Sequence, residues 1–142
     1  MDEFVYGSHS VGNNVHHFQW CTKYRYKMFR KDKNAKLCKQ AIQKVAKTHK
    51  IEIKEISVMP DHIHLIAQIP PTMSQSEAVR KLKGGSAYEI FRLKPRFRLR
   101  YQRGNLWGRG NFKDSVGRLT ADVAKEYVRD QSAHHAPEIC GL

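Results

Sequence analysis

The fold is decided by residues 51–69, which have the sequence IEIKEISVMPDHIHLIAQI. Apolar and polar side chains alternate on both sides of Met59-Pro60-Asp61, and a period of two is typical of β-strands. A link this short between two strands predicts an antiparallel hairpin. The alternation changes phase near Lys54-Glu55, which indicates a β-bulge or an irregular edge at that point.

A strand and a helix are predicted before this hairpin. The segment from Asn14 to Tyr24 is rich in aromatic and β-branched residues, which favours a strand. Between Leu37 and His49, apolar side chains recur at steps of three and four residues, which is the stripe of an amphipathic helix. Asp32 precedes that stripe and is a candidate for its N-terminal cap.

Helical signals also follow the hairpin. Ser74 and Glu77 have the spacing of a capping box and predict the start of a helix. Gly84-Gly85 is expected to break that helix, because glycine is a poor helix former. Residues 106–116 are predicted to form a strand with glycine interruptions, and roughly residues 120–133 a last helix.

This order of strands and helices predicts an α+β fold, with helices on one face of an antiparallel sheet in the split βαβ plan. The 142 residues fit one domain over 1–142, in which 1–13 and 134–142 are expected to be peripheral. No apolar run approaches the ~20 residues that cross a bilayer. The N-terminus lacks the pattern of a secretory signal, so we expect a soluble, cytoplasmic protein with no membrane partner.

The charge of the chain indicates a polyanionic partner. Lys and Arg total 26 against 13 acidic residues, a net charge of +13. Such an excess repels itself and is typical of nucleic-acid-binding proteins. Around Phe97 and Tyr101 basic residues alternate with apolar ones, so an extended segment would present one cationic face to phosphates. An edge strand protected by charge against aggregation is the alternative.

The candidate nucleic-acid-binding residues come from this segment and from a basic cluster after the first strand. Arginine planes and exposed rings also suit unpaired bases, so single-stranded nucleic acid is a possible partner. The candidates are Lys23, Arg25, Arg30, Arg96, Arg98, Arg100, Arg103 and Arg109.

His62 and His64 form the first candidate catalytic feature. Successive side chains of a strand point to opposite faces, so both histidines project from one face, while Ile63, Leu65 and Ala67 occupy the face expected beneath the helices. The histidines are therefore expected on the more open face. Two imidazoles can supply two ligands to one metal and leave positions for a third ligand and for substrate. Paired histidines on a polar strand face are also common as plain surface residues.

Tyr127 and Gln131 are the second candidate feature. They are four residues apart and therefore lie on one face of the predicted last helix. A tyrosine on an apolar stripe usually packs in a core. Its phenol, with a pKa near ~10, is a poor nucleophile at neutral pH unless a metal or a base assists it. A nucleophilic role requires this helix to lie beside the histidine pair, which residue spacing leaves open.

Four fragments stand in the same order as the signature segments of a known family. They are residues 15–25 (VHHFQWCTKYR), 59–65 (MPDHIHL), 106–117 and 125–131 (KEYVRDQ). Together they resemble the small single-tyrosine transposases (TnpA type) of minimal bacterial and archaeal insertion sequences, within the His-hydrophobic-His (HUH) nuclease superfamily. Residues 108–111 depart from the more aromatic pattern of that family.

The resemblance implies a ferredoxin-like (RRM-like) antiparallel sheet with helices on one face and a C-terminal catalytic helix. It implies a homodimer with active sites shared between subunits, and a cytoplasmic, nucleoid-associated location. His62 and His64 would bind Mg2+ or Mn2+, with Gln131 as third ligand. Tyr127 would attack single-stranded DNA, keep the 5′ end as a phosphotyrosine and release a 3′ hydroxyl. The DNA partner would carry stem-loop ends, gripped by the basic surfaces.

Two other functions fit parts of the sequence. A replication initiator or relaxase of the same superfamily shares the metal and tyrosine chemistry. A non-catalytic ferredoxin-like module would bind nucleic acid through the region of Phe97 and Tyr101, and its histidines would be incidental. A metal requirement for strand cleavage separates that module from either enzyme.

Overall fold

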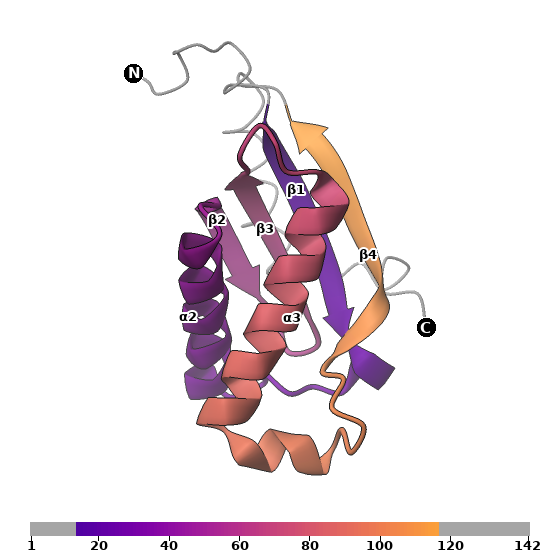
Figure 1. The fold of residues 1–142 in the computed structure, drawn as a ribbon. Coiled ribbons are helices and arrows are strands. Elements are labelled where there is room, and N and C mark those ends of the chain that lie inside the picture. Colours follow the sequence, from indigo (N-terminus) through magenta and orange to yellow (C-terminus); the bar gives the residue numbers. More distant parts are fainter. Residues whose placement is uncertain (1–13, 117–142) are drawn as a thin grey trace.

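The computed structural model describes residues 14–116, which form a four-stranded antiparallel sheet with two long helices on one face (Figure 1). The sheet order is β2-β3-β1-β4. In chain order the elements are β1 (Val15–Thr22), the 3₁₀ helix η1 (Lys23–Arg25), α2 (Asp32–Thr48), β2 (Glu52–Val58), β3 (His62–Gln68), α3 (Gln75–Leu93), the 3₁₀ helix η2 (Pro95–Leu99) and β4 (Trp107–Val116).

This arrangement confirms the predicted α+β, ferredoxin-like fold. The chain order strand, helix, strand, strand, helix, strand gives two βαβ halves whose central strands β1 and β3 lie side by side. The predicted C-terminal helix, with Tyr127 and Gln131, lies outside the described residues, as do the two predicted peripheral ends. Within residues 14–116 no helix is long and apolar enough to cross a membrane.

The hairpin of β2 and β3 has the predicted geometry. Val58 pairs with Ile63 across the turn, and the backbone N–H of Met59 donates to the carbonyl oxygen of His62 at 2.8 Å. The register shifts between Ile53 and Glu55, which confirms the irregularity predicted from the change of phase. After the shift, the strand presents its apolar side chains to the helices again.

The hydrophobic core lies between the sheet and the two helices. Ile63, Leu65 and Ala67 of β3 belong to it and are fully buried, as predicted from the alternation. Their helical neighbours are the apolar stripes of α2 and α3. Both helices lie on the same face of the sheet in Figure 1, so the side chains between these β3 residues point to the opposite face.

The prediction that Gly84-Gly85 breaks a helix was wrong. Helix α3 begins after Ser74, whose Oγ accepts a hydrogen bond from the backbone N–H of Glu77 at 3.0 Å, and it runs unbroken to Leu93. A Cβ added at Gly85 would lie 2.6 Å from Cγ1 of Val45 on α2. The glycine therefore lets the two helices approach closely, and this tertiary packing overrides its low helix propensity.

The basic segment after α3 is helical rather than extended. Pro95 begins η2, and the proline ring favours the first position of a helix. Phe97 and Tyr101 are four residues apart, so both turn toward the core, while Leu99 between them is 73% exposed. The alternation of cationic and apolar residues in this segment is therefore not a strand pattern.

Candidate active site

The imidazoles of His62 and His64 lie next to each other on the sheet face opposite the helices, with ring centroids 5.0 Å apart. Their partners across the sheet are residues of β1, Cys21 for His62 and Gln19 for His64. The expectation of an open face was wrong, because the two histidines are only 1% and 0% exposed. At these two positions the histidine face of β3 is therefore as buried as the face that meets the helices.

His62 is held by an acidic neighbour. Its Nδ1 lies 2.7 Å from Oδ1 of Asp61, and Oδ2 of Asp61 lies 3.2 Å from Nη2 of Arg25. Partial burial raises the pKa of Asp61, but the hydrogen bond from His62 and the charge of Arg25 outweigh it and hold the pKa below its usual range. An ionised carboxylate at Nδ1 keeps the proton on that nitrogen, which leaves the lone pair on Nε2 of His62.

Within residues 14–116, the remaining ring nitrogens of the pair have no hydrogen-bond partner. Nε2 of His62 and both Nδ1 and Nε2 of His64 are buried and unsatisfied. Burial, together with the charges of His62 and His17, lowers the pKa of His64 to about 3, so the imidazole of His64 is neutral. Unsatisfied buried polar atoms are rare and costly in native proteins, and one common explanation is a bound ion.

This donor set fits a divalent metal. Neutral imidazole nitrogens are frequent metal ligands, and a carboxylate on the far nitrogen is the usual support of a ligating histidine. Within residues 14–116 there is no group of three or more His, Cys, Asp or Glu residues that could hold a metal ion.

A third imidazole, that of His17, stands beside the pair, and it is not among the candidate site residues named from the sequence. The ring of His17 on β1 is stacked with that of His64 at a centroid distance of 5.9 Å, and it contacts the ring of Phe112 on β4 at 5.3 Å. His16 points to the other face, where its Nδ1 lies 2.7 Å from Nε2 of Gln75. Only the register between strands reveals this neighbour of His64.

A cationic cleft with a volume of about 1140 Å³ lies between α3, η2 and the start of β4. We call it the large cleft. Its walls include the rings of Tyr88, Phe91 and Trp107. Its basic side chains are Lys23, Lys83, Arg92, Arg98, Arg103 and Arg109.

A second hollow, the loop cleft, lies between the segment after β1 and the start of α2, and has a volume of about 500 Å³. Tyr26, Met28 and Asn34 contribute to its walls. Its basic side chains are Arg25, Lys27, Arg30, Lys31 and Arg100. The guanidinium of Arg100 lies 4.1 Å above the ring of Tyr26, which holds the charge at the rim.

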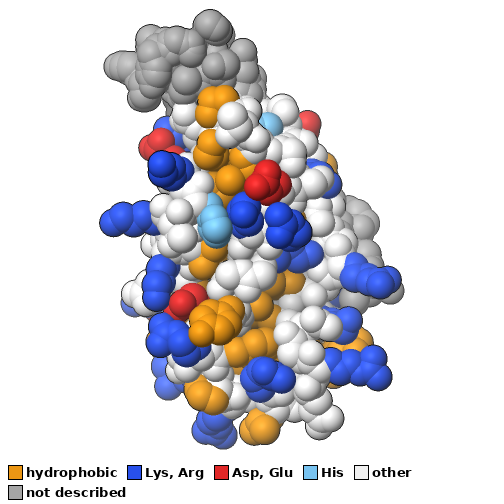
Figure 2. Space-filling view, viewed as in Figure 1, with side chains coloured by type: hydrophobic (Ala, Val, Ile, Leu, Met, Phe, Trp, Pro, Cys, Tyr) orange, Lys and Arg blue, Asp and Glu red, His pale blue; other side chains and the backbone are white. Residues whose placement is uncertain are grey.

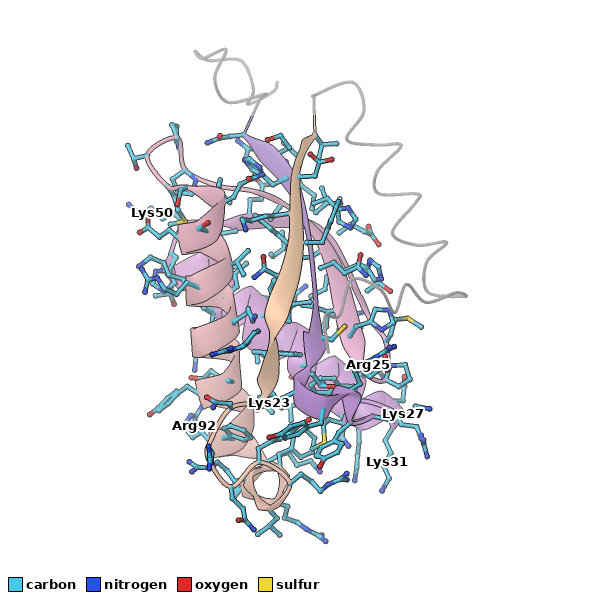
Figure 3. All side chains as sticks on the ribbon, turned by 90° about the vertical axis from the view of Figure 1, so that its right-hand side faces the viewer. Lys23, Arg25, Lys27, Lys31, Lys50 and Arg92 are labelled. Atoms are coloured by element: carbon cyan, nitrogen blue, oxygen red, sulfur yellow. The ribbon has the colours of Figure 1, made fainter. Side chains whose placement is uncertain are left out.

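The structure gathers most of the predicted nucleic-acid-binding residues into these two clefts. Lys23, Arg98, Arg103 and Arg109 line the large cleft, Arg25, Arg30 and Arg100 line the loop cleft, and Arg96 lines neither. Figure 3 shows the labelled cations of both clefts toward one end of the molecule, far from Lys50, and Figure 2 shows many basic and few acidic side chains on the helical face.

Two cations of the large cleft were not predicted. Arg92 and Lys83 belong to α3, and neither is among the candidate nucleic-acid-binding residues named from the sequence. Nζ of Lys83 donates to the carbonyl oxygen of Gly108 at 2.6 Å, and burial lowers the pKa of this lysine. In the sequence, the charged residues of α3 have the pattern of an ordinary solvent-exposed helix face. Only the position of the segment between η2 and β4 shows that they line a cleft.

Comparison with protein families identifies the chain. A family model described as "Transposase IS200 like" matches residues 10–131. The chain belongs to the IS200-like transposase family. DNA strand cleavage and transfer are therefore its class of chemistry, as the resemblance implied.

Curated transposases agree with this assignment. The transposase of insertion sequence element IS200 from Salmonella typhimurium is 29% identical over 124 residues, which cover 87% of this chain and 80% of that protein. The ISDra2 transposase TnpA from Deinococcus radiodurans is 29% identical over 116 residues, which cover 82% of each chain.

Solved structures extend the likeness to three dimensions. A candidate transposase from Deinococcus radiodurans R1 superposes with a TM-score of 0.71 at 28% identity, covering 89% of this chain and 97% of that one. A REP-associated tyrosine transposase bound to a REP hairpin superposes with a TM-score of 0.62 at 17% identity, covering 95% of this chain and 75% of that one. At that identity the second likeness supports the fold of this transposase.

Proposed function

We propose that this transposase binds the hairpin ends of an insertion sequence, and cleaves and rejoins single-stranded DNA through a 5′-phosphotyrosine intermediate. The observation that carries the proposal is the imidazole pair of His62 and His64. Its three unsatisfied ring nitrogens are buried together, and Asp61 holds one ring in the tautomer that a metal requires.

In this proposal His62, His64 and Gln131 hold one Mg2+ or Mn2+ ion. A bound divalent cation polarises the scissile phosphate and stabilises the charge that develops on it. The chain itself supplies the positions of the ligands: β3 fixes the spacing of the two imidazoles, and Asp61 fixes the orientation of His62. The low pKa of His64 keeps its imidazole neutral at neutral pH, so one of its two ring nitrogens has a free lone pair.

Tyr127 is the proposed nucleophile. Its phenolic oxygen bonds to the phosphorus of the scissile phosphodiester, the bond from phosphorus to the 3′ oxygen breaks, and that oxygen leaves as a 3′ hydroxyl. Attack of another 3′ hydroxyl on the phosphotyrosine reverses the step and joins the new strands. Because the covalent link conserves the energy of the broken bond, the exchange needs no ATP.

The basic clefts are the proposed grip on the DNA. The large cleft and the loop cleft together contain seven of the eight predicted binding residues, all but Arg96, and phosphate contacts supply most of the affinity for nucleic acid. A structural neighbour was solved with a REP hairpin, which supports a stem-loop as the ligand. We further propose a homodimer in which the active sites are shared between subunits.

The test is covalent capture. The protein is incubated with Mg2+ or Mn2+ and single-stranded DNA carrying the end hairpin and flank of its own element, and DNA-linked protein is resolved on a denaturing gel. We expect an adduct that disappears with EDTA, in Tyr127→Phe and in His64→Ala.

Each contrary outcome has a defined meaning. An adduct that persists in Tyr127→Phe would show that another residue is the nucleophile. Tight binding of the hairpin without an adduct in either ion would favour the non-catalytic binding module. Cleavage of DNA without any hairpin requirement would favour the replication-initiator or relaxase type of HUH nuclease.

A further inference from the structure

The segment after β1 has a strained backbone that calls for an explanation. Tyr24 and Arg25 both have positive φ angles, 61° and 54°, in the left-handed region that residues other than glycine rarely adopt. Two consecutive residues in this region persist only where the surroundings impose the conformation, and such strain is found most often at functional sites.

Four interactions impose this conformation. The hydroxyl of Tyr101 donates to the carbonyl oxygen of Lys23 at 2.9 Å, and the backbone N–H of Lys23 donates to the carbonyl oxygen of Leu106 at 2.8 Å. Oγ1 of Thr22 donates to the carbonyl oxygen of Tyr26 at 2.7 Å, and Arg25 pairs with Asp61. The backbone is thus fixed on both sides of Tyr24.

The result of this conformation is an aromatic ring held at the surface. Tyr24 is 56% exposed, although two other tyrosines pack beside it. Its ring centroid lies 5.4 Å from that of Tyr26 and 6.5 Å from that of Tyr101, and it is nearly parallel to the latter, at 13°. An exposed ring that is fixed in place can stack on a flat ligand at little cost in conformational entropy.

A separate hollow adjoins this ring. The tyrosine pocket, with a volume of about 230 Å³, lies between the segment after β1 and the loop after η2, and its lining residues are Lys23, Tyr24, Arg100, Tyr101, Gln102, Arg103 and Asn105. Three of these side chains are cations, two are tyrosines, two carry amides, and none is acidic. Nζ of Lys23 lies 5.3 Å from the centroid of the Tyr24 ring.

These three kinds of group match three features of a nucleotide: the flat face of its base, the polar edge of its base and its phosphate. Aromatic rings stack on nucleobases, side-chain amides donate to and accept from base edges, and cations bind phosphates. A base in a duplex is already stacked on both faces, so a single ring in a pocket of this size suits a base that is unpaired. We propose that the tyrosine pocket binds one unpaired nucleobase of single-stranded DNA, stacked on Tyr24.

In this site Gln102 and Asn105 contact the edge of the base, and Lys23, Arg100 and Arg103 contact the flanking phosphates. The inference rests on the proposed function only in taking single-stranded DNA as the substrate. The pocket opens beside the large cleft, because Lys23, Arg103 and Asn105 line both. A strand that runs along the large cleft can therefore place one base in the tyrosine pocket.

The experiment measures binding without cleavage. An oligothymidylate with one central 2-aminopurine is titrated with the full-length protein in EDTA, because the fluorescence of 2-aminopurine falls when it stacks on an aromatic ring. We expect Tyr24→Phe to bind and quench as the unaltered protein does. Tyr24→Leu, which keeps the Cβ and hence the backbone strain, is expected to lose most of the quenching and about 5- to 150-fold in affinity.

A matched variant and a matched ligand make the result specific. Leu99→Ala removes another exposed apolar side chain, which lines neither cleft nor the tyrosine pocket, and it should retain the quenching. A blunt duplex of the same length should bind Tyr24→Leu and the unaltered protein equally. Unchanged binding and quenching in a folded Tyr24→Leu, or an equal loss of affinity for the duplex, would overturn the proposal.

The two proposals fail separately. If the covalent adduct forms on a residue other than Tyr127, the proposal for the tyrosine pocket still stands, because the test of the pocket involves neither metal nor cleavage. Conversely, a Tyr24→Leu variant that binds single strands normally while the unaltered protein forms the Tyr127 adduct would reject the pocket alone.

Discussion

The two faces of strand β3 are equally buried and chemically opposite. Ile63, Leu65 and Ala67 face the helices, and their side chains need only close packing, which the core supplies. His62 and His64 face the other way with three ring nitrogens that have no partner. The protein alone supplies the packing that the first face needs, whereas the ring nitrogens of the second face need a hydrogen-bond partner or a bound ion. In our proposal, burial therefore serves stability on one side of this strand and metal binding on the other.

The largest expected effect separates the two faces by stability. Leu65→Ala removes a fully buried side chain from the core and should lower the free energy of unfolding by about 2–5 kcal/mol. His64→Ala, its neighbour on the opposite face, gives up no hydrogen bond of the described structure and should cost much less. Denaturant unfolding of both variants in EDTA is the measurement. Equal losses would show that the histidine face is also part of the core.

The next effect concerns Asp61, which supports the proposed metal ligand His62. Asp61→Asn keeps the size of the side chain but removes the charge that holds the proton on Nδ1 of His62. Such supporting groups typically contribute 10- to 100-fold to metal affinity, so we expect a loss of about that size for Mn2+. Titration followed by electron paramagnetic resonance measures it directly.

A control for this variant uses the other partner of Asp61. Arg25→Lys retains a positive charge near the carboxylate, and it should leave the affinity for Mn2+ closer to that of the unaltered protein. If Asp61→Asn binds Mn2+ normally, His62 is oriented by other groups.

A smaller effect tests how closely α2 and α3 pack against each other. Gly85→Ala places a methyl group against Val45 at 2.6 Å, and overpacking of this kind costs about 1–3 kcal/mol. Gly84→Ala is the matched control, because nothing lies within 4 Å of the added methyl group, and it should stabilise α3 by about 0.5–1 kcal/mol. Thermal unfolding compares the two. Opposite signs confirm the contact, and a stable Gly85→Ala would show that α2 and α3 can move apart.

The smallest expected effect near neutral pH is the pH dependence of stability that the buried imidazole of His64 causes. The pKa of His64 is lowered to about 3 in the folded protein, so the unfolded chain binds a proton between pH 6.5 and 3 that the folded chain does not. The stability that His64 contributes is therefore present above pH 6.5 and is lost progressively as the pH falls below it. Unfolding in EDTA at a series of pH values should show a slope that His64→Ala reduces. An identical slope in that variant would assign the acid sensitivity to other groups.

Much of the described fold could be predicted because its signals are local. The hairpin, its irregularity at Lys54-Glu55 and the cap at Ser74 each depend on residues within a few positions of one another. The opposition of His62 and His64 to Ile63 and Leu65 follows from the period of a strand alone. The family signature also depends on short fragments in chain order, and the family match agrees with it.

Local signals failed where two patterns coincide. Phe97, Leu99 and Tyr101 alternate with cations as in a strand, yet a spacing of four also places Phe97 and Tyr101 on one side of a helical turn. Packing against the core decided between the two. The prediction for Gly85 failed for a related reason. Its neighbour Val45 lies on another helix, and the close approach of α2 and α3 at this point, which the local sequence does not show, requires a glycine within an unbroken helix.

By itself the sequence determined the order of the elements, the two-faced character of β3, the excess of positive charge and the family. Only the tertiary structure decided that the histidine pair is buried, that His17 joins His64, and that cations from α3 and from two distant loops meet in the clefts. The physical reason is that periodicity specifies which face of an element a residue occupies. What that face meets depends on strand register and helix packing, which bring together residues far apart in the chain.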